Sequence, residues 1–205
     1  MHDLKFPMLL FPPSRSGKPD GGSLNGWRWY FWLALLVCCS VAFSLGFACA
    51  TPFAAFSAIA ALTLSRRDSA LVTAGVWLAN QVVGFTILKY PWTLNCLGWG
   101  IALGFAAILA TCAARWVARA LEEIRWNASC AAAFLVAFAV FEGVLFLAGL
   151  LILGGMEDFN LAIVSWIFVI NGVAFLGLLI LNWGARRLGL VPTGFGYRTS
   201  LLQNG

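Results

Sequence analysis

The residues of greatest chemical interest lie in one short stretch, "KYPWTLNCLGWG", which runs from Lys89 to Gly100. It holds a positive charge, a proline, two tryptophans, an asparagine and one cysteine between two long apolar segments. That cysteine, Cys96, has three interpretations: a small apolar residue that fills space, half of a disulfide bond with Cys49, or a soft thiolate ligand for a metal or a metal-bearing substrate. The residues alone leave all three open.

Aromatic side chains surround Cys96 in the sequence. Tyr90, Trp92 and Trp99 are typical of a membrane–water interface, where amphipathic rings gather, and they also suit the wall of a ligand site. Whichever holds, the stretch must be positioned by the apolar segments on either side of it.

Four polar residues within the predicted apolar spans are of particular interest. Glu142 is the one acid inside a predicted span, and an intramembrane carboxylate indicates either a polar cavity or a hydrogen bond to a neighbouring helix. Asn80, Gln81 and Asn171 are typical of polar contacts between membrane helices.

The composition sets the class of protein. Of the 205 residues, 61% are hydrophobic and 10% are charged, whereas a soluble domain carries roughly 25% charged residues. We therefore predict an all-α integral membrane protein. The net charge of +5 is interpreted as an orientation signal and not as a sign of nucleic-acid binding.

Six predicted transmembrane helices form a membrane domain at residues 27–190, between a mobile cytoplasmic tail at 1–26 and a cytoplasmic tail at 191–205. No cleavable signal peptide is expected. The predicted spans are 29–49, 51–64, 69–88, 94–114, 129–153 and 161–183. The second is short for a span and is expected to be a short or tilted helix, or partly re-entrant.

The basic residues orient these spans. With both ends in the cytoplasm, 12 of the 13 Lys and Arg residues lie inside, and Lys89 alone lies outside. The connection at 114–126 is predicted to be a short amphipathic helix on the inner surface. The stretch around Cys96 is then an outer loop.

Small residues recur at every fourth position as Gly46, Ala50, Ala54 and Ala58. Such a ridge lets helix backbones approach closely, either within the chain or against another subunit.

The sequence lacks the motifs that several classes of enzyme need for catalysis. The one histidine is His2, and we find no G-x-S-x-G, H-E-x-x-H or P-loop motif. No catalytic residue is therefore assigned, and active transport would need ATP-hydrolysing subunits.

Six spans in about 200 residues, both ends inside and a ligand-like cluster outside resemble the substrate-binding S components of energy-coupling factor (ECF) vitamin transporters. The likeness is closest to the cobalamin-specific solitary S components, the BtuM family. The resemblance implies a multi-pass protein of the bacterial inner membrane with cobalamin as transported ligand and no intrinsic cofactor. It also implies an ECF coupling subunit and ATPases as partners, beside membrane lipid and without nucleic acid.

The same resemblance assigns the site residues. Cys96 would be the ligand to cobalt, and cysteine-mediated decyanation of cyanocobalamin would be a side activity. The remaining substrate-binding residues would contact the corrin ring and its amides: Tyr90, Trp92, Thr93, Asn95, Trp99 and Phe159.

Two rival functions remain. One is a non-transporting scaffold subunit that packs into a larger complex through its small-residue ridges. The other is a small channel or exporter lined by Asn80, Gln81, Glu142 and Asn171. A vitamin-binding protein predicts instead an accessible thiol at Cys96 above an outward-facing cavity.

Overall fold

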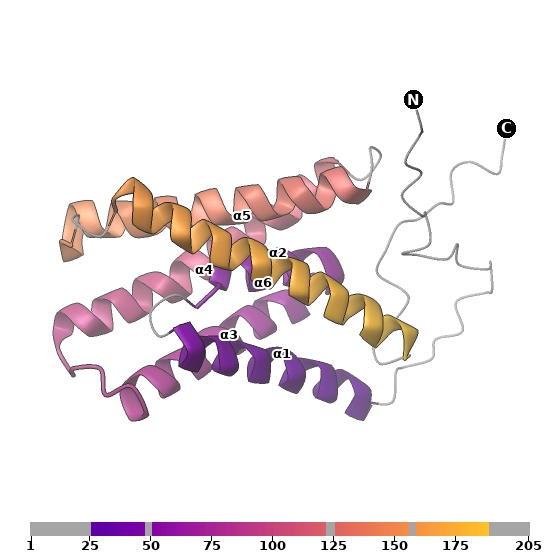
Figure 1. Ribbon diagram of the computed structural model, residues 1–205, viewed down its shortest axis with the longest axis horizontal. Helices are drawn as coiled ribbons and strands as arrows, with labels where there is room; N and C mark the ends of the chain where they lie inside the picture. The colour runs from indigo at the N-terminus through magenta and orange to yellow at the C-terminus, as the bar shows by residue number, and fades with distance from the viewer. Residues whose placement is uncertain (1–25, 48–50, 122–125, 156–158, 189–205) are drawn as a thin grey trace, which may run out of the picture.

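The computed structural model describes residues 26–47, 51–121, 126–155 and 159–188, and every regular element in these ranges is a helix. The helices are α1 Gly26–Phe47, α2 Phe53–Thr63, α3 Arg66–Thr86, α4 Leu94–Ala120, α5 Trp126–Ala148 and α6 Leu161–Arg187. A π-helical segment, η2 Gly149–Leu153, continues α5. Consecutive helices run in opposite directions, so α1 begins and α6 ends at the same end of the bundle (Figure 1).

Four helical segments are long and apolar enough to cross a membrane: α3, α4, α5 together with η2, and α6. The expectation of a transmembrane all-helical protein is confirmed at this level. All six predicted segments form helices, but α2 has only 11 residues. At 1.5 Å per residue it is roughly 16 Å long, about half the hydrocarbon thickness. The second segment is therefore the short helix that was one of the predicted alternatives.

Helix α2 is the centre of the bundle. It packs against α3, α4, α5 and α6, and all its residues except Leu62 are buried. Ala54 and Ala58 are 0% exposed, because small side chains let the surrounding helices approach α2 closely.

This burial decides between the two interpretations of the small-residue ridge. Gly46 lies in α1, Ala54 and Ala58 lie in α2, and Ala50 lies outside the described residues. Ala54 and Ala58 thus pack inside the chain, whereas Gly46 is exposed on α1. Another subunit could not reach Ala54 or Ala58, so at these two positions the small residues serve packing within the chain.

Buried polar side chains hold the N-terminal end of α2. The first N–H groups of any helix lack partners within that helix. Here the Ala55 amide donates to Asn171 Oδ1 of α6 at 3.1 Å. Asn80 Nδ2 of α3 donates to Thr51 Oγ1, just before α2, at 2.8 Å. Asn80 and Asn171 are therefore interhelical contacts, as predicted.

The other end of α2 is held by Arg115 of α4. Its Nη2 atom donates to the carbonyl oxygens of Leu64 and Ser65, both at 3.1 Å, and to Ser69 Oγ at 2.6 Å. One guanidinium thus ties together the end of α2, the turn and the start of α3. Three hydrogen bonds from Nη2 partly offset the cost of placing a charged side chain this far along α4.

Helix α4 also corrects one prediction. It continues without a break to Ala120, so residues 114–120 extend a membrane helix and do not form a separate surface helix. The apolar residues Ala114, Val117 and Ala118 let the last two turns keep packing against the bundle.

Candidate functional site at the N-terminal end of α4

The bend between α3 and α4 closes back on α3. Lys89 has φ 57°, a left-handed conformation that reverses the chain. The Tyr90 amide then donates to the Gly84 carbonyl at 3.0 Å. The Tyr90 ring lies directly over Gly84, where an added Cβ would be 2.6 Å from ring carbons. Glycine at position 84 therefore makes room for the ring.

Trp92 joins the same cluster. Its ring centroid lies 4.5 Å from that of Phe85, and Phe85 also makes an edge contact with Tyr90 at 6.2 Å. We call Phe85, Tyr90 and Trp92 the α3-side aromatic group. Trp92 is nevertheless 75% exposed, so most of its surface is free to contact something else.

Cys96 lies in the first turn of α4. Thr93 is the N-cap of this helix, and its Oγ1 accepts from the Cys96 amide at 3.2 Å. The Cys96 side chain is half-buried and its thiol is free. The alternative of a disulfide bond involves Cys49, which lies outside the described residues.

Cys96 lies on the side of α4 that faces α3. Residues four apart share a helix face, and the residue four further on, Gly100, packs against α3. An added Cβ there would be 2.6 Å from Gln81 Oε1, and Trp77 Nε1 donates to the Gly100 carbonyl at 2.7 Å. The thiol is thus on the side of the α3-side aromatic group.

The neighbouring face of α4 contacts the end of α5. Asn95 Nδ2 donates to the Leu153 carbonyl at 2.8 Å, and an added Cβ on Gly98 would be 2.7 Å from the Leu153 side chain. Trp99 and Phe159 both lie over Gly149, at 3.2 Å and 3.5 Å from the position of an added Cβ.

Phe159 also contacts Phe146 edge to face, with ring centroids 5.6 Å apart. We call Trp99, Phe146 and Phe159 the α5-side aromatic group. The predicted aromatic residues thus divide between the two groups. Tyr90 and Trp92 belong to the α3-side group, and Trp99 and Phe159 belong to the α5-side group. Thr93 and Asn95 already hold the backbone in place, through a cap and an interhelical hydrogen bond.

The π-helical segment η2 was not anticipated. π-Helical turns occur frequently at functional sites. Here the Gly154 amide donates to the Gly149 carbonyl at 2.8 Å, and Gly154 and Gly155 have φ 76° and 80°. The sequence signal that could have indicated it is this glycine spacing, because only glycine adopts such angles at low cost.

Glu142 lies one helical turn from Phe138 on α5 and is half-buried. Phe138 packs edge to face on Phe168 of α6, with centroids 5.0 Å apart. The Glu142 face of α5 is therefore the one that faces α6. Within the described residues its carboxyl group makes no hydrogen bond or ion pair. Asn80 of α3 and Asn171 of α6, by contrast, are hydrogen-bonded at the start of α2.

Two further observations bear on the chemistry. Within the described ranges no three His, Cys, Asp or Glu side chains gather to hold a metal ion. A cavity of about 210 Å³ lies at the opposite end of α4, away from Cys96. Comparison with protein families, with curated proteins and with solved structures finds no match for this chain.

Proposed function

We propose that this chain is a membrane-embedded, S-component-like protein that binds a vitamin at its outer end, with cobalamin as the vitamin and Cys96 as the ligand to cobalt. The observation that carries the proposal is the free, half-buried thiol of Cys96, at the start of a membrane helix and flanked by two aromatic groups. The hydrogen bonds of Thr93 and Asn95, which hold this end of α4 in place, do not involve the thiol.

A single thiolate ligand, that of Cys96, suits a metal that is already coordinated by a macrocyclic ring. A metal bound by the protein alone needs three or four ligands, and the described residues supply no such cluster. Cobalt held by a corrin ring needs only an axial ligand, and thiolate is a soft donor of the kind that binds such metals.

A large ligand would have to lie in an open cleft at this end. Pockets for drug-sized ligands measure about 300–1,000 Å³, and the cavity of about 210 Å³ is both smaller and at the other end of α4. The exposed face of Trp92 and the aromatic ring of Trp99 would pack on the planar ring of such a ligand. Asn95 keeps Oδ1 to accept from a ligand amide, because its Nδ2 is bonded to Leu153.

The topology proposed with this function has six membrane crossings and both ends in the cytoplasm of a bacterial inner membrane. The distribution of arginine supports it. Because consecutive helices alternate in direction (Figure 1), one end of the bundle carries the start of α3 and the ends of α4 and α6. That end holds Arg66, Arg67, Arg115, Arg119, Arg186 and Arg187. The positive-inside rule assigns it to the cytoplasm.

An ECF coupling subunit and its ATPases remain part of the proposal as the source of energy. Since Ala54 and Ala58 are buried, such a subunit would have to contact an outer helix. The apolar outer face of α6, with Trp166, Val173 and Ile180 exposed, is available to a partner or to lipid.

Calorimetry in detergent tests the vitamin site. Cobalamin should bind the wild-type protein, and Cys96→Ala should weaken binding by at least about tenfold, or 1.4 kcal/mol, through loss of the metal bond. Cys38→Ala removes a different free thiol, which is exposed on α1, and this variant should bind cobalamin normally. Absence of cobalamin binding to the wild type would remove the proposal and leave the scaffold or the channel as the function to test.

A further inference from the structure

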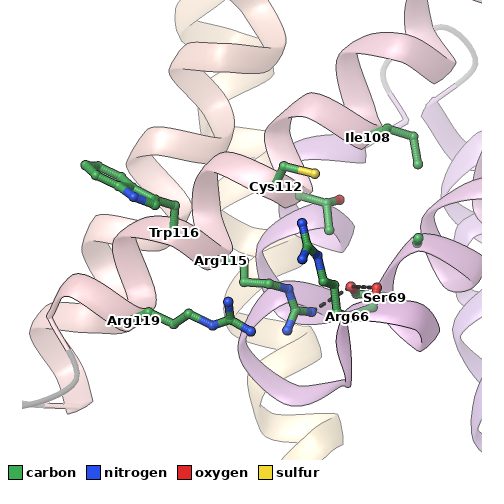
Figure 2. Close-up of a pocket in the computed structure, with 9 residues that line it drawn as sticks. Arg66, Ser69, Ile108, Cys112, Arg115, Trp116 and Arg119 are labelled. Atoms are coloured by element: carbon green, nitrogen blue, oxygen red, sulfur yellow. Dashed lines mark hydrogen bonds between the residues drawn. The ribbon is translucent and has the colours of Figure 1, made fainter.

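The cavity at the other end of α4 has a charge pattern of its own. Helices α3 and α4 enclose about 210 Å³ there, and its wall includes three arginines, Arg66, Arg115 and Arg119 (Figure 2). No carboxylate lines it. The nearby Asp68 of α3 is bonded to Ser65 as part of the helix cap.

Arg115 is pre-organised in this cavity. Its Nη2 is held by Leu64, Ser65 and Ser69, and its other N–H groups make no hydrogen bond within the described residues. The guanidinium is therefore fixed on one edge and open on the other. Its Nε and Nη1 groups remain to donate charge-assisted hydrogen bonds to the oxygens of a phosphoryl group.

Two further features favour an anion at this place. Three like charges around one cavity repel one another unless an anion lies among them. The first turn of α3, which contributes Arg66, adds the positive end of a helix dipole. Trp116, which is 73% exposed, lies on the cavity wall and is typical of the depth at which lipid headgroups lie.

We infer that this cavity is a binding site for a phosphoryl anion, with Arg115 as its fixed ligand and Arg66 and Arg119 as mobile ones. A volume of about 210 Å³ accommodates a phosphate with a small ester group and leaves acyl chains outside, along the apolar face of α4. The phosphoryl group comes either from an anionic phospholipid of the surrounding leaflet or from free phosphate.

Cys112 provides a local readout because its exposed thiol also lines the cavity. The alkylation rate of Cys112 in the detergent-purified full-length chain would be followed by peptide mapping, with the exposed thiol of Cys38 on α1 as internal reference. The probes are inorganic phosphate against chloride at equal ionic strength, and micelles doped with phosphatidylglycerol against phosphatidylcholine. Occupancy should slow alkylation at Cys112 by about tenfold and leave Cys38 unchanged.

The source of the phosphoryl group follows from which probe protects. Protection by phosphatidylglycerol alone identifies a lipid headgroup, whereas protection by inorganic phosphate as well identifies the free anion. The double variant Arg66→Gln/Arg119→Gln should lose the protection. Arg67→Gln/Arg187→Gln removes the same charge from exposed arginines outside the cavity and should keep it. No protection by either anion, equal protection by phosphatidylcholine, or equal loss in both double variants would overturn the site.

Discussion

At the scale of single residues, the polar side chains inside the membrane segments are mostly explained by α2. A short helix buried in a bundle exposes unpaired N–H and C=O groups at both ends, and in an apolar interior each costs about 1–3 kcal/mol if left unbonded. Asn171 and Arg115 satisfy one end each. Glu142 and Cys96 have no such structural task among the described residues, which makes them the candidates for function.

Asn171→Ala should lower the free energy of unfolding by about 1–3 kcal/mol more than a cavity alone explains, because the Ala55 amide loses its partner. Asn182→Ala is the matched control. Asn182 is on the same helix and also 1% exposed, but its Oδ1 has no hydrogen-bond partner in the part of the chain that the structure describes. Thermal unfolding in detergent measures both, and equal losses would show that Asn171 does not hold α2.

At the scale of elements, α2 sets the packing of the whole bundle. Helices α3, α4, α5 and α6 pack against it, and its alanines leave no room for larger side chains. Between α3 and α4, by contrast, large and small residues alternate. An added Cβ on Gly104 would lie 2.8 Å from the Trp77 ring, which is held in place by its hydrogen bond to Gly100.

Ala58→Leu should destabilise the isolated protein by at least about 1–3 kcal/mol, because added methyl groups in a packed interior displace their neighbours. The same substitution at Ala131, which is exposed on α5, should have little effect. If Ala58 faced another subunit instead, the two variants would unfold alike in detergent.

Gly104→Ala should also lower the melting temperature, since the ring of Trp77 cannot move without breaking its bond to the Gly100 carbonyl. Nothing lies within 4 Å of an added Cβ at Gly143 in α5, so Gly143→Ala should be neutral or slightly stabilising. Equal melting temperatures for the two variants would show that the α3–α4 contact is looser than described.

At the scale of the whole molecule, the two ends of the bundle differ in chemistry. One end gathers arginines around a small cavity, and the other gathers aromatic rings around a cysteine. An arginine-rich end is expected on the cytoplasmic side of a membrane protein, because Lys and Arg are enriched on that side.

Cysteine labelling tests this orientation. In a background without native cysteines, Leu94→Cys at the start of α4 should react with an impermeant maleimide on intact spheroplasts, because Leu94 is 89% exposed and the proposed topology puts it outside. Arg67→Cys at the start of α3 should react only after lysis. Labelling of both variants on intact spheroplasts, or of Arg67→Cys and not of Leu94→Cys, would contradict the proposed topology.

Much of the fold follows from the sequence, because apolar length and arginine position are local signals. They predict the helices and the same-end placement of the start of α1 and the end of α6. The central place of α2 could not be predicted, since a run of alanines looks alike whether it faces lipid, a partner or the bundle. At the site, the pairing of Tyr90 with Gly84, and of Trp99 and Phe159 over Gly149, depends on contacts between distant residues. The cavity beside Arg115 was missed because it needs the turn after α2 to be in place.

The visible spectrum of the protein purified from cells grown with cobalamin tests the central claim most directly. We predict that the wild-type protein and Cys38→Ala carry a corrinoid spectrum with bands shifted by a sulfur ligand, and that Cys96→Ala lacks the shift or the corrinoid altogether. A colourless wild-type protein, or the same spectrum from Cys96→Ala as from the wild type, would contradict the assignment of Cys96 as the cobalt ligand.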